Sequence, residues 1–275
     1  MTSSNPPRRV YEPGAFPALF KRPSIFLSAS VPYARDPQAL LRAVIGDAEA
    51  TSDFFTRDAH PDRIRDTVVY IGRAAITRGY NLIFGGHPAI TPLMLEVARR
   101  FALDDDVVDA ASGDTKKRVI TFQSEHFLDR IPEASRALGD ETLGVLLWTP
   151  AGDGYDASLT QMRAAMTQVP NLRAAVFVGG MAGLFEEGHL ARVRKLPCYA
   201  IATGGGAAHH LCKDGIAPAK QDDRRLAPHP KRAFHGASGD LHKDLLKQRS
   251  DALLVKRIFD EIDGLGRSSN DQPAL

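Results

Sequence analysis

Four short apolar runs in this chain end in very small residues, and this pattern constrains the fold more than any other feature. With the turns that follow them, they are SIFLSAS at 24–30, LIFGGHPAI at 82–90, AVFVGGMAGLFEE at 175–187 and CYAIATGGGAAHHL at 198–211. Each is typical of a buried strand, a turn and then a helix. In a parallel sheet with right-handed crossovers, such turns share one edge. Small residues there let a ligand approach the backbone, and helix N-terminal amides favour an anion such as phosphate.

The whole chain alternates between strand and helix patterns. We expect strands at 24–30, 81–84, 118–122, 143–149, 174–178 and 198–202. Helices are expected near 37–50 and at 61–78, 88–100, 157–168 and 240–262. This alternation predicts an α/β fold with a mostly parallel sheet of about six strands.

The segments differ in character and predict four regions. Residues 1–22 are rich in proline and polar groups and are expected to form an extended arm. A nucleotide-binding domain is expected over 23–212, and a polar, mobile insertion over 213–239. A C-terminal helix with a frayed tail from 264 is expected within 240–275.

Composition excludes several classes of function. The net charge of +2 gives no reason to expect nucleic acid as a partner, and the lysines and arginines of 213–232 are balanced by aspartates. No apolar run approaches the roughly 20 residues that span a bilayer, and the N-terminus does not resemble a signal peptide. We expect a cytoplasmic protein without membrane contact, in which Cys198 and Cys212 are buried, reduced thiols.

The segment 179–187 carries the strongest candidate for ligand binding. Gly179, Gly180 and Gly183 lack Cβ atoms where the turn bends, and Met181 lies between them. Glu186 and Glu187 follow in the first turn of the expected helix, where they can accept hydrogen bonds from ribose hydroxyls. The alternative is that both glutamates only complement the helix dipole.

Three further turns supply candidate ligand contacts, each with a structural alternative. The candidate residues at the end of the first expected strand are Ser28 and Ser30. After the second strand they are Gly85, Gly86 and His87, and after the sixth strand they are Thr203 and Gly204. The serines can instead cap a helix, the histidine can be structural, and the glycines can serve tight helix–sheet packing. Trp148 is a candidate for base stacking or, alternatively, for the core.

We expect neither a metal nor another cofactor. His209 and His210 are adjacent, so on a helix their side chains diverge by about 100° and do not serve one ion. The acidic run 104–106 is interpreted as a solvated loop.

Three motifs, FLSASVP at 26–32, FGGHPAI at 84–90 and GGMAGLFEE at 179–187, together resemble the SLOG superfamily. The resemblance covers roughly 22–212. Members include the LOG phosphoribohydrolases, the DNA-processing Smf/DprA proteins and ligand-sensing domains of bacterial anti-phage systems. The resemblance implies a Rossmann-like, doubly wound domain that binds a nucleotide or nucleotide-derived signal over the strand carboxyl ends.

The LOG enzymes hydrolyse the bond between a base and ribose 5′-monophosphate, and their pattern PGGxGTxxE carries an assisting glutamate. Glu186 matches that glutamate, and Arg163 matches an upstream arginine. The chain departs from the pattern in four places: Val178 replaces the proline, Ala182 a glycine, Gly183 the threonine and Ala164 a lysine of the arginine-lysine-x-Met helix. Without the threonine hydroxyl, a phosphate loses one hydrogen bond.

Three functions follow as hypotheses. The preferred one is a sensor or regulatory module for a nucleotide-derived molecule, such as an ADP-ribose derivative, in signalling or defence. The second is an N-glycoside hydrolase that uses Glu186 and Arg163. The third is a structural partner that has lost ligand binding. Homo-oligomers are expected from the resemblance alone.

Overall fold

The computed structural model describes residues 9–32, 55–56, 58–102, 118–139, 143–214 and 239–270. The strands are β1 (Ser24–Ser30), β2 (Asn81–Phe84), β3 (Val119–Ser124), β4 (Gly144–Thr149), β5 (Leu172–Gly179) and β6 (Cys198–Ile201). The α-helices are α3 (Pro61–Thr77), α4 (Thr91–Ala102), α5 (Glu133–Leu138), α6 (Gly154–Thr167), α7 (Gly183–Val193), α8 (Gly206–Asp214), α9 (Gly239–Lys247) and α10 (Asp251–Asn270). Two 3-10 helices are η2 (Glu125–Arg130) and η3 (Ala202–Gly204).

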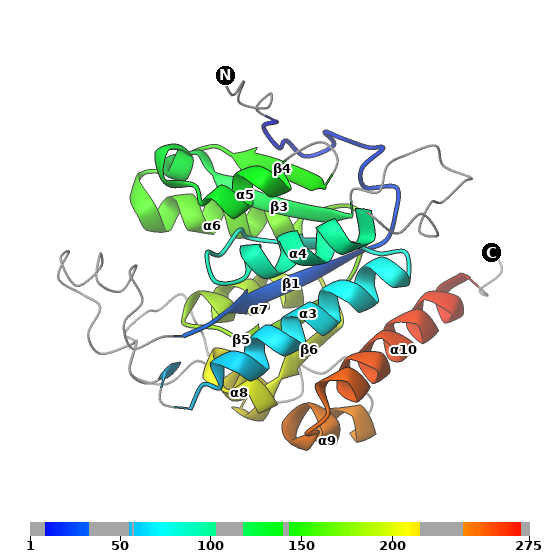
Figure 1. Ribbon diagram of the computed structural model, residues 1–275. Coiled ribbons are helices and arrows are strands. Elements are labelled where there is room, and N and C mark those ends of the chain that lie inside the picture. Colours follow the sequence, from blue (N-terminus) through cyan, green and yellow to red (C-terminus); the bar gives the residue numbers. More distant parts are fainter. Residues whose placement is uncertain are drawn as a thin grey trace. The chain divides into compact units, whose positions relative to one another are not determined.

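The six strands form one parallel sheet in the order β4-β3-β2-β1-β5-β6, flanked by helices (Figure 1). This confirms the predicted α/β, Rossmann-like, doubly wound class. The core strands are apolar on both faces, as parallel sheets covered by helices require. In β5, for example, residues 174–178 are fully buried.

The chain divides into two compact units. Unit 1 comprises 1–26 and 75–172, and unit 2 comprises 27–74 and 173–275. Unit 1 therefore holds β2, β3 and β4, and unit 2 holds the carboxyl-terminal half of β1, nearly all of β5, and β6. The domain boundaries expected at 22, 212 and 239 stay predictions.

Several expectations fall outside the described residues. They are the helix near 37–50, the acidic loop at 104–106 and nearly all of the insertion at 213–239. In the part of the chain that the structure describes, no helix is long and apolar enough to cross a membrane.

In unit 1, residues of the expected N-terminal arm pair with β4. Val10 forms a parallel bridge with Trp148, and the Tyr11 N–H donates to the Trp148 carbonyl over 2.7 Å. The Tyr11 ring then packs edge-on against Phe20 and Phe122. Trp148 is 7% exposed, so its indole belongs to the core rather than to a stacking surface.

Helix α4 begins three residues later than predicted. Residues 87–90 form a turn, in which the His87 carbonyl accepts hydrogen bonds from the N–H groups of Ile90 and Thr91, both over 2.9 Å. The Thr91 hydroxyl donates to the same carbonyl over 2.9 Å. These bonds close a separate turn around Pro88, so the regular helix starts at Thr91.

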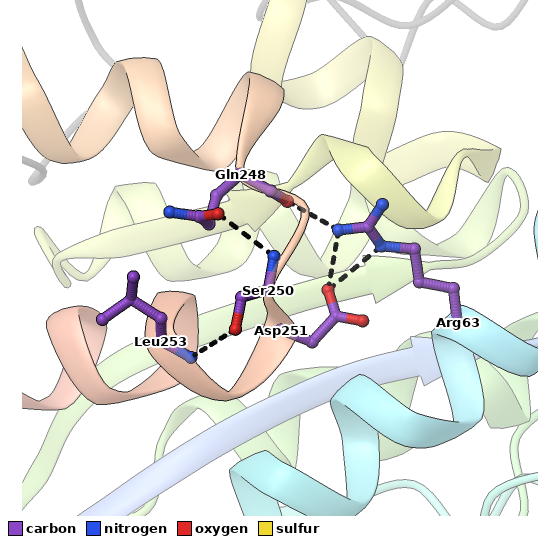
Figure 2. A network of polar contacts seen from close by, with 5 residues as sticks. All are labelled: Arg63, Gln248, Ser250, Asp251 and Leu253. Atoms are coloured by element: carbon purple, nitrogen blue, oxygen red, sulfur yellow. Dashed lines mark hydrogen bonds and ion pairs between the residues drawn. The ribbon is translucent and has the colours of Figure 1, made fainter.

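The C-terminal segment forms two helices, so the prediction of one helix over 240–262 is wrong. Ser250 interrupts it: the Leu253 N–H donates to the Ser250 hydroxyl, an N-cap bond that starts α10 (Figure 2). Helix α10 then runs to Asn270, so the expected tail from 264 is also wrong for 264–270. An Arg257–Asp244 ion pair joins α10 to α9.

Arg63 on α3 holds the corner between these two helices. Its Nε and Nη2 atoms both donate to Asp251 Oδ1 over 3.0 Å, and Nη2 also donates to the Gln248 carbonyl over 2.6 Å (Figure 2). The Arg63 and Asp251 side chains are only 25% and 12% exposed. Limited contact with water strengthens such a charged, forked interaction.

The segment that leads into α3 packs tightly on the turn after β6. The His60 N–H donates to the Gly204 carbonyl over 2.9 Å. Gly205 adopts φ +73°, and a Cβ on it would lie 1.8 Å from the Asp58 carbonyl oxygen. Only glycine therefore allows these two backbone segments to meet.

We predict that Arg63→Ala lowers the free energy of unfolding by about 1–2 kcal/mol, because it leaves Asp251 without its charged donor. Lys243→Ala is the matched control, since Lys243 also pairs with an aspartate but both side chains are about 80% exposed. It should cost about 0.5 kcal/mol or less. Urea unfolding measures both variants, and equal losses would contradict a structural role for Arg63.

We also predict that Gly205→Ala costs several kcal/mol more than Gly154→Ala. Both glycines have positive φ, but nothing lies within 4 Å of a Cβ on Gly154. The control therefore carries only the backbone strain, about 1–2 kcal/mol, whereas Gly205→Ala adds a clash with backbone. Thermal unfolding compares the two variants. Similar melting temperatures would contradict the prediction, because they would show that the 58–60 segment moves to accommodate the added methyl group at little cost.

Candidate functional site

The strand order reverses between β1 and β5. Strands β2, β3 and β4 follow β1 toward one side of the sheet, and β5 and β6 lie on the other. In open α/β sheets, ligands bind outside the strand carboxyl ends at such a reversal. The carboxyl ends of β1 and β5 both belong to unit 2, and the Gly180 N–H donates to the Ser30 carbonyl over 2.8 Å. The structure thus brings together two of the segments that the sequence singled out.

A buried serine and a glutamate meet at this reversal. Ser28 of β1 is 3% exposed, and its hydroxyl donates to Oε2 of Glu187 on α7. Glu187 itself is half-buried. Its carboxylate is therefore held over the end of β1, where an ionised carboxylate can accept several hydrogen bonds.

The turn between β5 and α7 has a buried part and an accessible part. Gly179 and Gly180 are buried, whereas Met181, Ala182 and Gly183 are partly exposed. The N-cap residue Ala182 makes no side-chain capping bond. Because the first N–H groups of a helix lack intrahelical acceptors, residues 181–183 are where the backbone can meet a ligand.

Glu186 lies in the first turn of α7, as predicted, and Glu187 follows it. Adjacent helical residues point about 100° apart. The carboxylate that accepts the hydrogen bond from Ser28 of β1 belongs to Glu187. Because the two glutamate side chains leave α7 in different directions, they do not contact the same atoms.

Ile64 of α3 occupies the space above two of the predicted ligand-binding glycines. A Cβ on Gly179, which has φ +61°, would lie 2.6 Å from Ile64 Cδ1 and from the Ser30 carbonyl oxygen. A Cβ on Gly204 would lie 3.0 Å from Ile64 Cγ1. Ile64 is fully buried. Close packing alone therefore requires small residues here, and ligand contact at these glycines stays a prediction.

Thr203 and Gly204 end η3, directly after β6. The Thr203 hydroxyl oxygen is buried and has no hydrogen-bond partner among the described residues. Gly204 accepts the His60 bond described above, so the tight-packing alternative accounts for it. Ligand contact at both residues stays a prediction.

The remaining turn, with Gly85, Gly86 and His87, lies in unit 1 after β2. The Gln123 side chain donates from Nε2 to the Gly86 carbonyl over 3.0 Å, and His87 Nδ1 accepts from the Ala89 N–H over 3.2 Å. The sequence analysis missed Gln123. It lies just beyond the strand expected at 118–122, whereas in the structure β3 continues to Ser124 and leaves Gln123 only 7% exposed, so its amide needs a partner.

Arg163 lies on α6 in unit 1 and is half-buried. Two methionines of the same helix, Met162 and Met166, pack near Gly85. A Cβ on Gly85 would lie 3.1 Å from Met162 Cε and 3.2 Å from Met166 Cε. Glu186 lies in unit 2. The catalytic pairing of Arg163 with Glu186 therefore stays a prediction.

Both cysteines and the pair His209 and His210 lie in unit 2. Cys198 and Cys212 are free and buried, as expected, and burial raises the pKa of each thiol to about 12. Both remain protonated at neutral pH and are poor nucleophiles. His209 Nδ1 contacts the Ala202 carbonyl at 3.3 Å, and no cluster of three or more His, Cys, Asp or Glu side chains suited to a metal occurs in the described ranges.

Comparison with known proteins identifies the family. A family model described as the SLOG cluster3 family matches residues 54–228, more than half of the chain. The match includes FGGHPAI and GGMAGLFEE but starts after FLSASVP. No curated protein matches the sequence. The chain belongs to the SLOG cluster3 family.

Proposed function

We propose that this protein binds a nucleotide or nucleotide-derived signalling molecule, such as an ADP-ribose derivative, and acts as a sensor or regulatory module. The binding region comprises the end of β1, the turn 179–183 and the start of α7. Family membership is consistent with a nucleotide-related role. A place in anti-phage defence, a cytoplasmic location and self-association belong to the same proposal.

The observation that carries this proposal is the position of the turn. It follows β5 at the point where strand order reverses, and its accessible residues open a helix of 11 residues. Unbonded amides and the positive end of the helix dipole favour acceptor groups of a ligand there. Ser28 and Glu187 add side-chain polarity beside them. A nucleotide offers both kinds of group, acceptor oxygens and hydroxyl donors.

We predict that Gly183→Phe weakens nucleotide binding at least tenfold, about 1.4 kcal/mol, because the new side chain covers the accessible backbone. The matched control is Val193→Phe, which places the same side chain at the other end of α7, where Val193 is 64% exposed. Isothermal titration with AMP, NAD, ADP-ribose and cyclic ADP-ribose measures both. Equal affinity of the two variants would contradict binding at this turn.

The alternative proposal is an N-glycoside hydrolase of the LOG type or an NAD-related nucleosidase. Glu186 supports it, since it occupies the first turn of α7 as the LOG pattern requires. The absence of the pattern's threonine at Gly183 and of its lysine at Ala164 weighs against it.

The hydrolase alternative predicts base release from AMP or NAD, with kcat falling about 10²- to 10⁴-fold in Glu186→Gln, as for loss of a general acid or base. Glu133→Gln is the control, because Glu133 is an exposed glutamate in the first turn of another helix, α5. Chromatography of the released base measures turnover. The same kcat in wild type and Glu186→Gln would rule out catalysis by Glu186.

A further inference from the structure

We infer that the end of α7 and the start of β5 form a docking surface for an acidic peptide segment of a partner protein. The surface comprises three cationic residues, Arg173, Arg194 and Lys195, and the apolar residue Val193. We call these four residues the basic surface. Because α7 runs back from the carboxyl end of β5 to the amino end of β6, this surface lies at the opposite edge of the sheet from the proposed nucleotide-binding region. The inference therefore goes beyond the proposed function.

The stretch of chain that carries the basic surface is poor in acidic residues. Between Asp156 and Asp214 it contains only two, Glu186 and Glu187. Both lie in the first half of α7, whereas the basic surface begins at Val193, the last residue of that helix. About 9 Å of helix therefore separate Glu187 from Val193.

The three cations are also exposed to solvent. Within the ranges that the structure describes, the side chains of Arg173, Arg194 and Lys195 form neither an ion pair nor a hydrogen bond. Neighbouring cations repel one another, and an anionic partner relieves that repulsion. Charge complementarity of this kind selects partners and accelerates their association.

The pairing of β5 with β6 brings Arg173 to the end of α7. Ala175 is opposite Cys198 in the parallel register, and the Ala175 N–H donates to the Pro197 carbonyl over 2.9 Å. Arg173 precedes Ala175 by two residues, so it lies beside the connection 194–197 that leads from α7 into β6. All of these residues belong to unit 2.

The backbone at Lys195 has a conformation that favours glycine. Its φ is +56°, its N–H donates to the Arg192 carbonyl over 2.8 Å, and the Leu196 N–H donates to the Ala191 carbonyl over 3.0 Å. This pair of bonds is a Schellman motif, in which the left-handed residue is usually glycine. The helix dipole favours cations in the last turn, but it explains neither a lysine in this conformation nor Arg173 on a strand. Backbone strain of this kind is concentrated at functional positions.

The apolar part of the basic surface indicates which kind of anion fits. Val193 is 64% exposed, the highest fraction among the large apolar side chains of the described residues, and Leu196 and Pro197 are partly exposed. A peptide with both acidic and apolar side chains can bury these apolar atoms and pair with the cations around them, as protein interfaces do. A nucleic-acid backbone binds through its phosphates and gains little from an exposed valine. The structure therefore favours an acidic peptide.

The first experiment selects peptides from a phage-displayed random library. The library is depleted on the immobilised double variant Arg194→Gln, Lys195→Gln and then selected on wild type. We expect the enriched peptides to be acidic and to carry at least one large apolar side chain. Enriched peptides that are neutral or basic, or a selection that enriches nothing over bare beads, would overturn the inference.

The second experiment measures the affinity of one enriched peptide by fluorescence anisotropy. The double variant Arg194→Gln, Lys195→Gln should bind it at least about tenfold more weakly, and wild-type affinity should fall as salt is raised. The matched control is Arg99→Gln, Arg100→Gln, which removes two exposed arginines from the last turn of α4 and should change the affinity about twofold or less. Equal losses in the two double variants would overturn the inference. So would an oligothymidylate that displaces the peptide and loses affinity in the same variant, because it would assign the surface to nucleic acid.

The variant Lys195→Gly separates binding from folding. Glycine relieves the left-handed backbone, so the melting temperature should stay the same or rise while the peptide binds more weakly. Unchanged affinity in this variant would overturn the inference, because the lysine side chain would then have no part in binding. Nucleotide titrations should give the same result in wild type and in Lys195→Gly, since the two regions lie at opposite edges of the sheet.

Discussion

The close approach of α3 to the ends of β5 and β6 is the constraint on which the rest of unit 2 depends. Ile64 fills the space that side chains at Gly179 and Gly204 would need, and the Gly204 carbonyl accepts the N–H of His60. Two glycine turns and one helix thereby form a single packed layer. Protein interiors tolerate little added volume, so a larger residue at either glycine would force Ile64 to move.

Arg63 links the same helix, α3, to the C-terminal helices. It precedes Ile64 in the chain and binds Asp251 and the Gln248 carbonyl at the corner between α9 and α10 (Figure 2). In the first turn of α3, Arg63 therefore contacts the C-terminal helices, and the next residue, Ile64, contacts the glycine turns at the ends of β5 and β6.

Much of the fold was accessible from local sequence. Strands β1 and β2 have the predicted bounds, because each contains a short apolar run, 25–27 or 82–84, that small residues follow directly. The errors have local physical causes. Helix α4 starts late because the His87 carbonyl closes a turn of its own, and the C-terminal helix divides because Ser250 caps α10. A Ser-Asp pair at 250–251 is a helix-start signal that the sequence analysis overlooked.

The sequence by itself determined that six strands occur and in which order along the chain, and it determined the bounds of β1 and β2, since these depend on patterns within a few residues. It also determined the family resemblance, through motifs that are continuous in the chain. Only the tertiary structure decided that Ile64 lies over the glycines and that Glu187, not Glu186, meets Ser28. These contacts join residues more than 100 positions apart, and the strand order that creates them arises from long-range packing that no local pattern encodes.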